Sequence, residues 1–296
     1  MKKFSGVGVA LVTPFDETGR VDEHSLRNLV NYVIDGGVDY LVALGTTSEA
    51  ATMTADERAF VVQVIAEENA GRLPIVLGIG GNNTAQVIHD LATLSYLRLG
   101  DAILSVTPYY NKPSQEGIYQ HYKAISEATD LPIVLYNVPG RTGVNMKAET
   151  TLRIARDFKN VIAIKEASGD ISQMDDIIKN KPANFDVISG DDGITFPLIT
   201  LGAVGIISVI GNAFPREFSR MVRLALAGDY DSARTIHHSF TELFSLLFVD
   251  GNPAGAKSML NMMGFIENKL RLPLVPTRIV TYEKIREVLR QLSIKC

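Results

Sequence analysis

The sequence predicts an α/β fold, namely a (β/α)8 or TIM barrel with a C-terminal helical appendage. The chain has 296 residues, a length that eight strands and eight helices routinely occupy. Short runs rich in β-branched residues alternate with segments that have the apolar spacing of helices. The runs are apolar at successive positions, as expected for parallel strands that are covered on both faces.

The predicted strands follow one another at regular intervals along the chain. In order they are residues 7–12, 40–44, 75–79, 102–106, 133–136, 161–165, 186–189 and 205–209. The helices expected between them include residues 57–68, 84–99 and 115–129. Polar or Pro-containing stretches that can cap a helix precede the last two.

Further helical segments follow the eighth predicted strand. The first, residues 218–226, would complete the barrel, so we predict a barrel over residues 1–228 and a C-terminal extension over residues 229–296. Helices are expected in the extension at residues 230–248, 254–263 and 282–292. Since no Ser/Gly-rich linker separates the extension, we expect it to pack on the barrel.

The composition favours a protein that binds small molecules. Apolar residues make up 46% of the chain and charged residues 21%, which suffices for a sizeable core without disulfides or metals. The formal net charge is −4 and no run of Lys or Arg reaches five residues, so we expect neither a nucleic-acid nor a membrane partner. The only cysteine, Cys296, excludes an intrachain disulfide and favours a cytoplasmic location.

Two apolar segments resemble targeting or membrane sequences only superficially. Residues 7–12 form a short run with no cleavage-site pattern, so a strand is expected there and not a signal peptide. Residues 201–214 are interrupted by glycines, Ser208 and Asn212, and they fall short of the about 20 apolar residues that cross a bilayer.

Barrel enzymes carry their reactive groups at the C-terminal ends of the strands. In this sequence, hydroxyl and cationic side chains collect at those positions. The segments are GTTSE at 45–49, TPYYN at 107–111, YNVPGR at 136–141 and KEAS at 165–168. We expect the barrel to bring them together at one face.

Lys165 ends the sixth predicted strand after four apolar residues. An ammonium group is poorly solvated in an apolar barrel interior, and a neutral amine can attack a ketone. Tyr136 ends the preceding strand, where its phenol can move protons during imine chemistry. The alternatives are a lysine that reaches solvent and a tyrosine that is packed in the core.

Two other strand ends carry groups suited to carboxylates. Thr46 and Thr47 lie in a Gly-led turn, where hydroxyl and backbone N–H groups can hold an anion, although helix capping is the alternative. Arg141 lies in a Pro-Gly-Arg-Thr-Gly loop and can bind a second carboxylate through both of its terminal nitrogens, although a solvated loop arginine is possible.

Metal and dinucleotide cofactors are not expected. The five histidines fall in helical stretches without metal-ligand spacing, and we expect them on the surface: His24, His89, His121, His237 and His238. Asp191 and Asp192 are expected to cap the helix that follows the seventh strand. The glycine cluster at residues 78–81 lacks the third glycine or alanine of the dinucleotide fingerprint.

Four segments together resemble the dihydrodipicolinate (4-hydroxy-tetrahydrodipicolinate) synthases, within the N-acetylneuraminate lyase superfamily of class I aldolases. They are GTTSE at 45–49, TPYYNKP at 107–113, YNVPGRTG at 136–143 and IKEAS at 164–168, and the likeness spans essentially the whole chain. The resemblance implies condensation of pyruvate with L-aspartate 4-semialdehyde, on the route to diaminopimelate and lysine.

The same resemblance implies a role for each site residue. Lys165 would form the imine with pyruvate, while Tyr136, Thr46 and Tyr110 would relay protons. Thr47 would bind the pyruvate carboxylate and Arg141 the carboxylate of the semialdehyde.

The remaining implied positions concern the pocket wall and the assembly. Gly190 and Ile207 would line the pyruvate pocket. Tyr110 would reach into the neighbouring subunit of a homo-oligomer, a tetramer built as a dimer of dimers. The turn departs from the family pattern at Ser48, where glycine is common, but both threonines are kept.

The alternative is another member of the superfamily, such as an N-acetylneuraminate lyase or a 2-keto-3-deoxy sugar-acid aldolase. These would share Lys165 and Tyr136. Arg141 and the Thr46-Thr47 pair favour the synthase, because sialic-acid lyases generally lack that arginine and carry Ser-Thr in the turn.

Feedback inhibition by lysine is expected to be weak or absent. Lysine-sensitive members of the family carry Ser, His, His and Glu at positions that here are Ala50, Ala55, Arg58 and Gln86, although Asn82 and Tyr109 are kept. The Gln removes a partner for an ammonium group, and the Arg adds a like charge.

Overall fold

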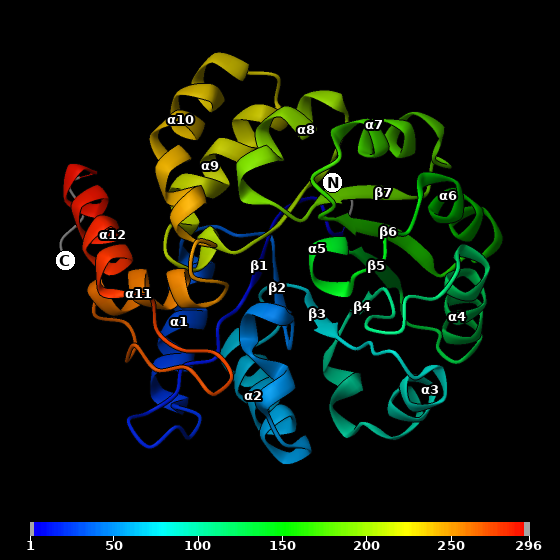
Figure 1. Ribbon diagram of the computed structural model, residues 1–296, viewed down its shortest axis with the longest axis horizontal. Coiled ribbons are helices and arrows are strands. Elements are labelled where there is room, and N and C mark those ends of the chain that lie inside the picture. Colours follow the sequence, from blue (N-terminus) through cyan, green and yellow to red (C-terminus); the bar gives the residue numbers. More distant parts are fainter. Residues whose placement is uncertain (1–2, 293–296) are drawn as a thin grey trace.

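The computed structural model describes residues 3–292, and its strands close into an eight-stranded barrel in chain order (Figure 1). Every neighbouring pair is parallel, including β1 with β8. The strands are β1 Gly6–Ala10, β2 Tyr40–Ala43, β3 Ile75–Gly78, β4 Ala102–Val106, β5 Ile133–Asn137, β6 Val161–Glu166, β7 Asp186–Ser189 and β8 Gly205–Ser208. The predicted fold is therefore confirmed. Cys296, used in the sequence argument, lies outside the described residues.

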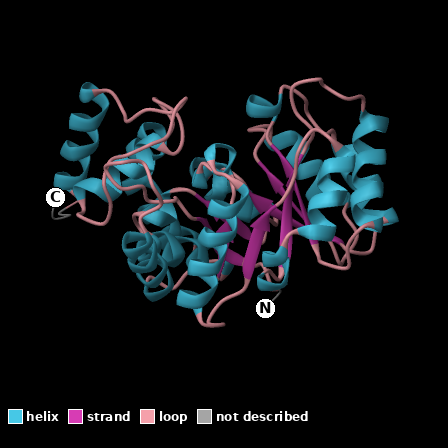
Figure 2. Ribbon diagram, turned by 90° about the horizontal axis from the view of Figure 1, so that it is seen from below, coloured by secondary structure: helices cyan, strands magenta, loops and turns pink. Residues whose placement is uncertain are grey.

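Helices surround the strands, as Figures 1 and 2 show. Those of the barrel are α1 Glu23–Asp35, α2 Ala55–Asn69, α3 Thr84–Thr93, α4 Gln115–Glu127, α6 Ala148–Asp157, α7 Ile171–Asn180, α8 Thr195–Leu201 and α9 Pro215–Leu226. A short helix, α5 Pro139–Thr142, lies in the loop after β5. Single helical turns are η1 Thr46–Ser48, η2 Ala50–Thr52, η3 Ser95–Leu99, η4 Asp192–Ile194 and η5 Ile210–Asn212.

The C-terminal segment, residues 229–292, adds α10 Tyr230–Leu246, α11 Ala254–Met262 and α12 Ile279–Gln291. In Figure 1 these helices gather at one side of the barrel. Helix α10 packs on α9, and α12 packs on α10 and α11. None of the helices described between residues 3 and 292 is long and apolar enough to span a membrane.

The core has two apolar layers, one inside the barrel and one between strands and helices. Alternation along β5 and β6 divides their side chains between the layers. Val134 and Ala163 belong to the interior cluster, whereas Leu135 and Ile164 pack toward the helices. Residues two further along each strand therefore face inward as well.

One predicted helix, residues 84–99, is wrong as a single element. Helix α3 ends at Thr93 and η3 begins at Ser95, because Leu94 adopts an extended backbone with ψ 112°. The Thr93 hydroxyl donates to the His89 carbonyl, the local bond with which threonine competes with a helix. The break lets Tyr96 turn into the core, where it is buried.

The prediction that His121 lies on the surface is also wrong. It lies on α4 with only 4% of its surface exposed, and its Nδ1 lies 2.8 Å from the Thr84 hydroxyl of α3. No described residue bonds its Nε2. Burial lowers the pKa of His121 to about 4.

We expect His121 to make stability depend on pH. Because its pKa is about 4 in the fold, below the ordinary 6.5, its contribution is present above pH 6.5 and is lost as pH falls toward about 4. Chemical denaturation across this range should show a shallower loss of unfolding free energy for His121→Gln than for the unmodified chain. His89→Gln, at an exposed position, is the control. Equal slopes for all three proteins would contradict the assignment.

Candidate active site

Lys165 and Tyr136 lie side by side at the C-terminal ends of β6 and β5. The two residues are register partners. Each stands two positions after an interior residue of its strand, so both side chains enter the barrel interior. The pairing predicted from the sequence is present.

Lys165 is buried but has no charged partner. Its exposed fraction is 6%, and its Nζ lies 4.3 Å from the centroid of the Tyr136 ring. Among the ion pairs of residues 3–292, none includes Lys165. A Cβ at Gly190 would lie 3.2 Å from Lys165 Cε and 2.6 Å from Ala167 Cβ, so only glycine leaves room for the lysine chain.

Lys257 shows that burial alone does not identify a reactive lysine. It lies on α11 and its side chain is 0% exposed, but its Nζ contacts Glu49 Oε1 at 2.6 Å. Burial lowers the pKa of Lys257 to about 8, although the Glu49 carboxylate opposes the shift. An ammonium held in this way is not available as a nucleophile, whereas the amine of Lys165 is unpaired.

Thr46 and Thr47 form the turn η1 directly after β2. Thr46 is exposed, whereas Thr47 is buried and its hydroxyl accepts a hydrogen bond of 2.9 Å from Asn252 Nδ2. Both threonines line a cavity that also reaches Lys165. The turn therefore presents hydroxyl groups to the same space as the lysine.

This cavity has a volume of about 270 Å³ and opens at the C-terminal face of the barrel. Its lining includes Thr46, Thr47, Tyr136, Arg141, Lys165 and Gly190, six of the eight residues predicted for the site. Arg141, on α5, is exposed at the cavity edge. It also lines a neighbouring cavity of about 480 Å³.

Two predicted residues do not line the cavity around Lys165. Ile207 is 1% exposed and belongs to the apolar interior of the barrel. Tyr110 is 86% exposed, in a backbone conformation with φ 78°. Within one chain its hydroxyl is presented to the outside.

Sequence reasoning missed the part of the site that comes from the C-terminal segment. Phe248 and Asn252 line the cavity, and Asn252 holds Thr47. Asn252 lies in a short Asp-Gly-Asn-Pro connection between α10 and α11, a pattern that indicates a turn but not its destination. The only signal in the sequence was this turn pattern in the connection between α10 and α11.

Glu166 follows the lysine and points to the opposite side of β6. Its carboxylate accepts hydrogen bonds from Asn137 Nδ2 at 3.0 Å, Ser168 N at 2.8 Å and Gln173 Nε2 at 3.1 Å. Burial raises the pKa of Glu166, although the hydrogen bonds from Asn137 and Ser168 oppose the shift. This network joins β5, β6 and α7 behind the site.

The predicted capping role holds for Asp191 but is wrong for Asp192. Asp191 accepts a bond from the Gly193 backbone at the start of η4. Asp192 is buried and instead accepts bonds from the Ser208 hydroxyl at 2.5 Å and from the Val209 backbone at 3.1 Å. Burial raises the pKa of Asp192 to about 6. The chain reversal after β7 brings Asp192 beside the end of β8, a contact that capping patterns do not reveal.

A closed (β/α)8 barrel with an unpaired lysine inside the end of one strand, a tyrosine beside it and a cavity above has the arrangement of a class I aldolase. Comparison with known proteins identifies the family. The model of the dihydrodipicolinate synthetase family matches residues 3–292. The chain therefore belongs to that family.

Two curated relatives, both named 4-hydroxy-tetrahydrodipicolinate synthase, match the chain over nearly its full length. The protein of Parabacteroides distasonis is 77% identical and that of Phocaeicola vulgatus 69%, with 98% and 99% of each chain covered. The family and the enzyme class predicted from the sequence are thus confirmed.

Solved structures agree in fold. Dihydrodipicolinate synthase from Thermotoga maritima has a TM-score of 0.95 and 45% identity, with 99% of both chains covered. The enzyme from Acinetobacter baumannii in complex with pyruvate has a TM-score of 0.94 and 41% identity, covering 98% of this chain and 99% of that one. The enzyme from Cyanidioschyzon merolae with lysine bound has a TM-score of 0.94 and 37% identity, covering 99% and 100%.

Proposed function

We propose that this chain condenses pyruvate with L-aspartate 4-semialdehyde to give 4-hydroxy-tetrahydrodipicolinate, through an imine on Lys165. The observation that carries the proposal is the buried amine of Lys165, which has no carboxylate partner and lies against Tyr136 at the base of the cavity. The activity named for the relatives supports it. The reaction takes place in the cytoplasm.

The first half of the reaction follows from the chemistry of an amine and a ketone. The Lys165 amine adds to the carbonyl carbon of pyruvate, and loss of water gives the imine. Removal of a proton from the methyl carbon gives an enamine, whose carbon attacks the aldehyde of the second substrate. The new alkoxide takes a proton, and the amino group of the second substrate displaces the lysine as the ring closes.

The cavity lining supports a role for each neighbouring group. Tyr136 and Thr46 move protons between oxygen and nitrogen atoms at the base of the cavity. Thr47 and its turn bind the pyruvate carboxylate, and Arg141 at the edge binds the carboxylate of the semialdehyde. Gly190 and Ile207 shape the pyruvate pocket, one by lacking a side chain and the other from the interior below.

Tyr110 acts in the site of a second subunit of a homo-oligomer, a tetramer arranged as a dimer of dimers. Tyr110 is 86% exposed in one chain, so its hydroxyl is free to enter the cavity of a neighbouring subunit. A partner subunit that covers the ring would receive its hydroxyl as the last member of the proton relay.

Imine formation tests the proposal directly. Incubation with pyruvate and borohydride should fix a pyruvate adduct on the Lys165 peptide. Lys165→Ala should abolish it, because Lys165 is the only buried lysine without an ion-pair partner among residues 3–292. Peptide mass analysis locates the adduct, with Lys112→Ala as the control. An adduct on Lys112 or Lys257 would refute the assignment.

The choice of second substrate separates the synthase from a lyase. Aspartate semialdehyde should be accepted in preference to N-acetylmannosamine, and the reverse preference would indicate a lyase.

Tyr110→Phe should lower turnover by about 10²- to 10⁴-fold while keeping the fold, since only a proton-relay hydroxyl is lost. If the hydroxyl acts across subunits, mixing Tyr110→Phe with Lys165→Ala chains should restore part of the activity, because some sites then combine an intact lysine with an intact tyrosine. Near-normal turnover of Tyr110→Phe removes the residue from the mechanism. Mixed oligomers without recovered activity would show that sites are not shared.

The larger cavity bears on regulation by lysine. It is lined by Ala50, Arg58 and Tyr109, and Asn82 donates to the Tyr109 carbonyl at 3.2 Å. Arg58 places a positive charge at the cavity wall, and its buried Nε bonds to no described residue. A second cation is unfavourable beside it.

We therefore expect L-lysine to inhibit weakly or not at all. Initial rates at saturating pyruvate with increasing lysine measure this, and a loss of about 1.4 kcal/mol in binding already weakens inhibition tenfold. The double variant Arg58→His, Gln86→Glu should increase lysine sensitivity by removing the like charge and adding a carboxylate. Strong inhibition of the unmodified chain at sub-millimolar lysine would contradict this account of the cavity.

A further inference from the structure

We propose that Glu49 is a positioning residue: it fixes the Thr46–Thr47 turn by binding Lys257 and Arg271 of the C-terminal segment. The segment is thereby part of the catalytic apparatus. The inference rests on the proposed function of the two threonines, and deepens it by naming what holds them.

Glu49 joins the two single-turn helices that follow β2. Its backbone has φ 60° and ψ 30°, the left-handed region that residues with a Cβ rarely adopt. The conformation reverses the chain after the threonines and directs the Glu49 side chain into the protein. That side chain is 0% exposed. A strained backbone of this kind persists only where its surroundings hold it.

Lys257 is the first of two residues of the C-terminal segment that hold Glu49. Its ammonium lies 2.6 Å from Glu49 Oε1, donates to the Lys269 carbonyl at 2.8 Å and lies 4.2 Å from the centroid of the Phe15 ring. The Lys257 ammonium therefore joins helix α11 to the loop after it and to the loop after β1. The first carboxylate oxygen of Glu49 is thus fixed from the C-terminal side.

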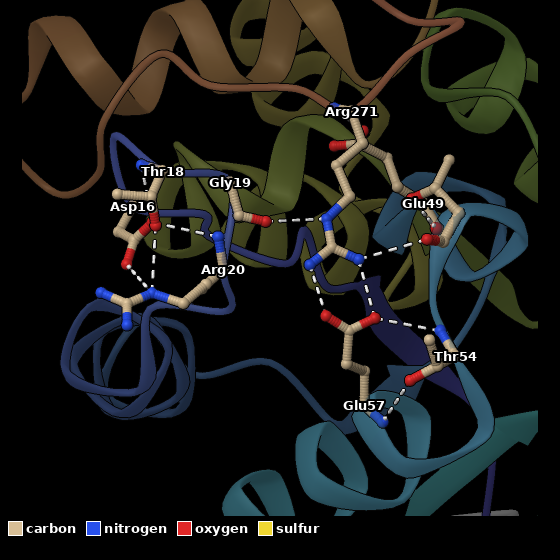
Figure 3. A network of polar contacts seen from close by, with 9 residues as sticks. Asp16, Thr18, Gly19, Arg20, Glu49, Thr54, Glu57 and Arg271 are labelled. Atoms are coloured by element: carbon tan, nitrogen blue, oxygen red, sulfur yellow. Dashed lines mark hydrogen bonds and ion pairs between the residues drawn. The ribbon is translucent and has the colours of Figure 1, made fainter.

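Arg271 is the second residue that holds Glu49, as Figure 3 shows. Its backbone N–H donates to Glu49 Oε2 at 2.9 Å, so each oxygen of Glu49 has its own partner. Its guanidinium bonds Glu57 Oε1 at 2.5 Å and Oε2 at 2.8 Å, and Nε donates to the Gly19 carbonyl at 2.9 Å. The Arg271 guanidinium lowers the pKa of Glu57 to about 2.

The same segment also holds the turn from its other end. Asn252 Nδ2 donates to the Thr47 hydroxyl at 2.9 Å, two residues before Glu49. The turn is therefore held at Thr47 by the Asn252 side chain and at Glu49 by the Lys257 side chain and the Arg271 backbone, all more than 200 positions along the chain. A movement of the C-terminal segment would therefore be transmitted to Thr47 and Glu49.

A buried ion pair is weak evidence for stability, because the cost of removing both charges from water offsets much of their attraction. Replacing both partners by neutral side chains of similar shape is often neutral or stabilising. What the Glu49–Lys257 pair supplies is a defined geometry for the turn. Removing the pair should then impair pyruvate binding while leaving the fold intact.

The test uses the full-length double variant Glu49→Gln, Lys257→Met, which removes both charges and keeps the side-chain shapes. Borohydride trapping measures the pyruvate concentration that gives half-maximal imine formation, and it should rise on the order of tenfold to a hundredfold as Thr47 moves from its position. The KM for the semialdehyde should stay unchanged, because Arg141 is outside the network. Arg153→Met, which breaks the pair of Arg153 with Glu116 between α6 and α4, is the control and should change neither quantity.

Glu57→Gln provides a second variant if the double variant does not fold. Gln can keep the capping box with Thr54 but loses the paired contact with Arg271, so a smaller rise in the pyruvate requirement is expected. A folded variant with an unaltered pyruvate requirement overturns the positioning role. Equal impairment toward both substrates overturns it too, since general disruption would have that effect. If the unmodified chain traps no pyruvate, the proposed function itself fails, and this inference with it.

Discussion

The register between β5 and β6 is the constraint on which the rest of the site depends. It places Tyr136 beside Lys165 inside the barrel, and in the next position it places Asn137 beside Glu166 outside it. A shift of β6 by one residue would put the Glu166 carboxylate in the cavity beside Tyr136 and the lysine among the helices. Hydrogen bonds from Asn137 and Gln173 to Glu166 oppose such a shift, so the polar network behind the sheet fixes the geometry in front of it.

The second structural requirement is that the turn after β2 be held from outside the barrel. The two single-turn helices and the left-handed Glu49 are joined by local hydrogen bonds, all between residues 45 and 53. Asn252, Lys257 and Arg271 provide the long-range contacts. Without the C-terminal segment the turn would keep only its local bonds, such as that from the Glu49 backbone N–H to the Thr46 carbonyl at 3.2 Å.

How far the site could be predicted follows from the range of the interactions involved. Lys165 and Tyr136 stand at strand ends and Arg141 in the loop after β5, and the parallel order of a barrel brings all such ends to one face, so local patterns were enough. Asn252 and the partners of Glu49 could not be found in this way, because they meet the turn across more than 200 residues. The break at Leu94 and the burial of His121 depend on packing against neighbouring helices, for which the sequence has no periodic signal.

Among the carboxylates near the strand ends, Asp191 lines the cavity itself, whereas three others are buried and held by their own donors. Glu49, Glu166 and Asp192 are all buried near strand ends around the cavity, and each could have paired with Lys165 or repelled a keto acid. Instead each is bound by donors away from the cavity: Glu49 by the C-terminal segment, Glu166 by residues behind β6, and Asp192 by the end of β8. Because every carboxylate oxygen that a donor occupies is one fewer competitor for the lysine, these networks both hold the strand ends and leave the amine of Lys165 unpaired. The same hydrogen bonds therefore hold the strand ends in place and keep these carboxylates from pairing with Lys165.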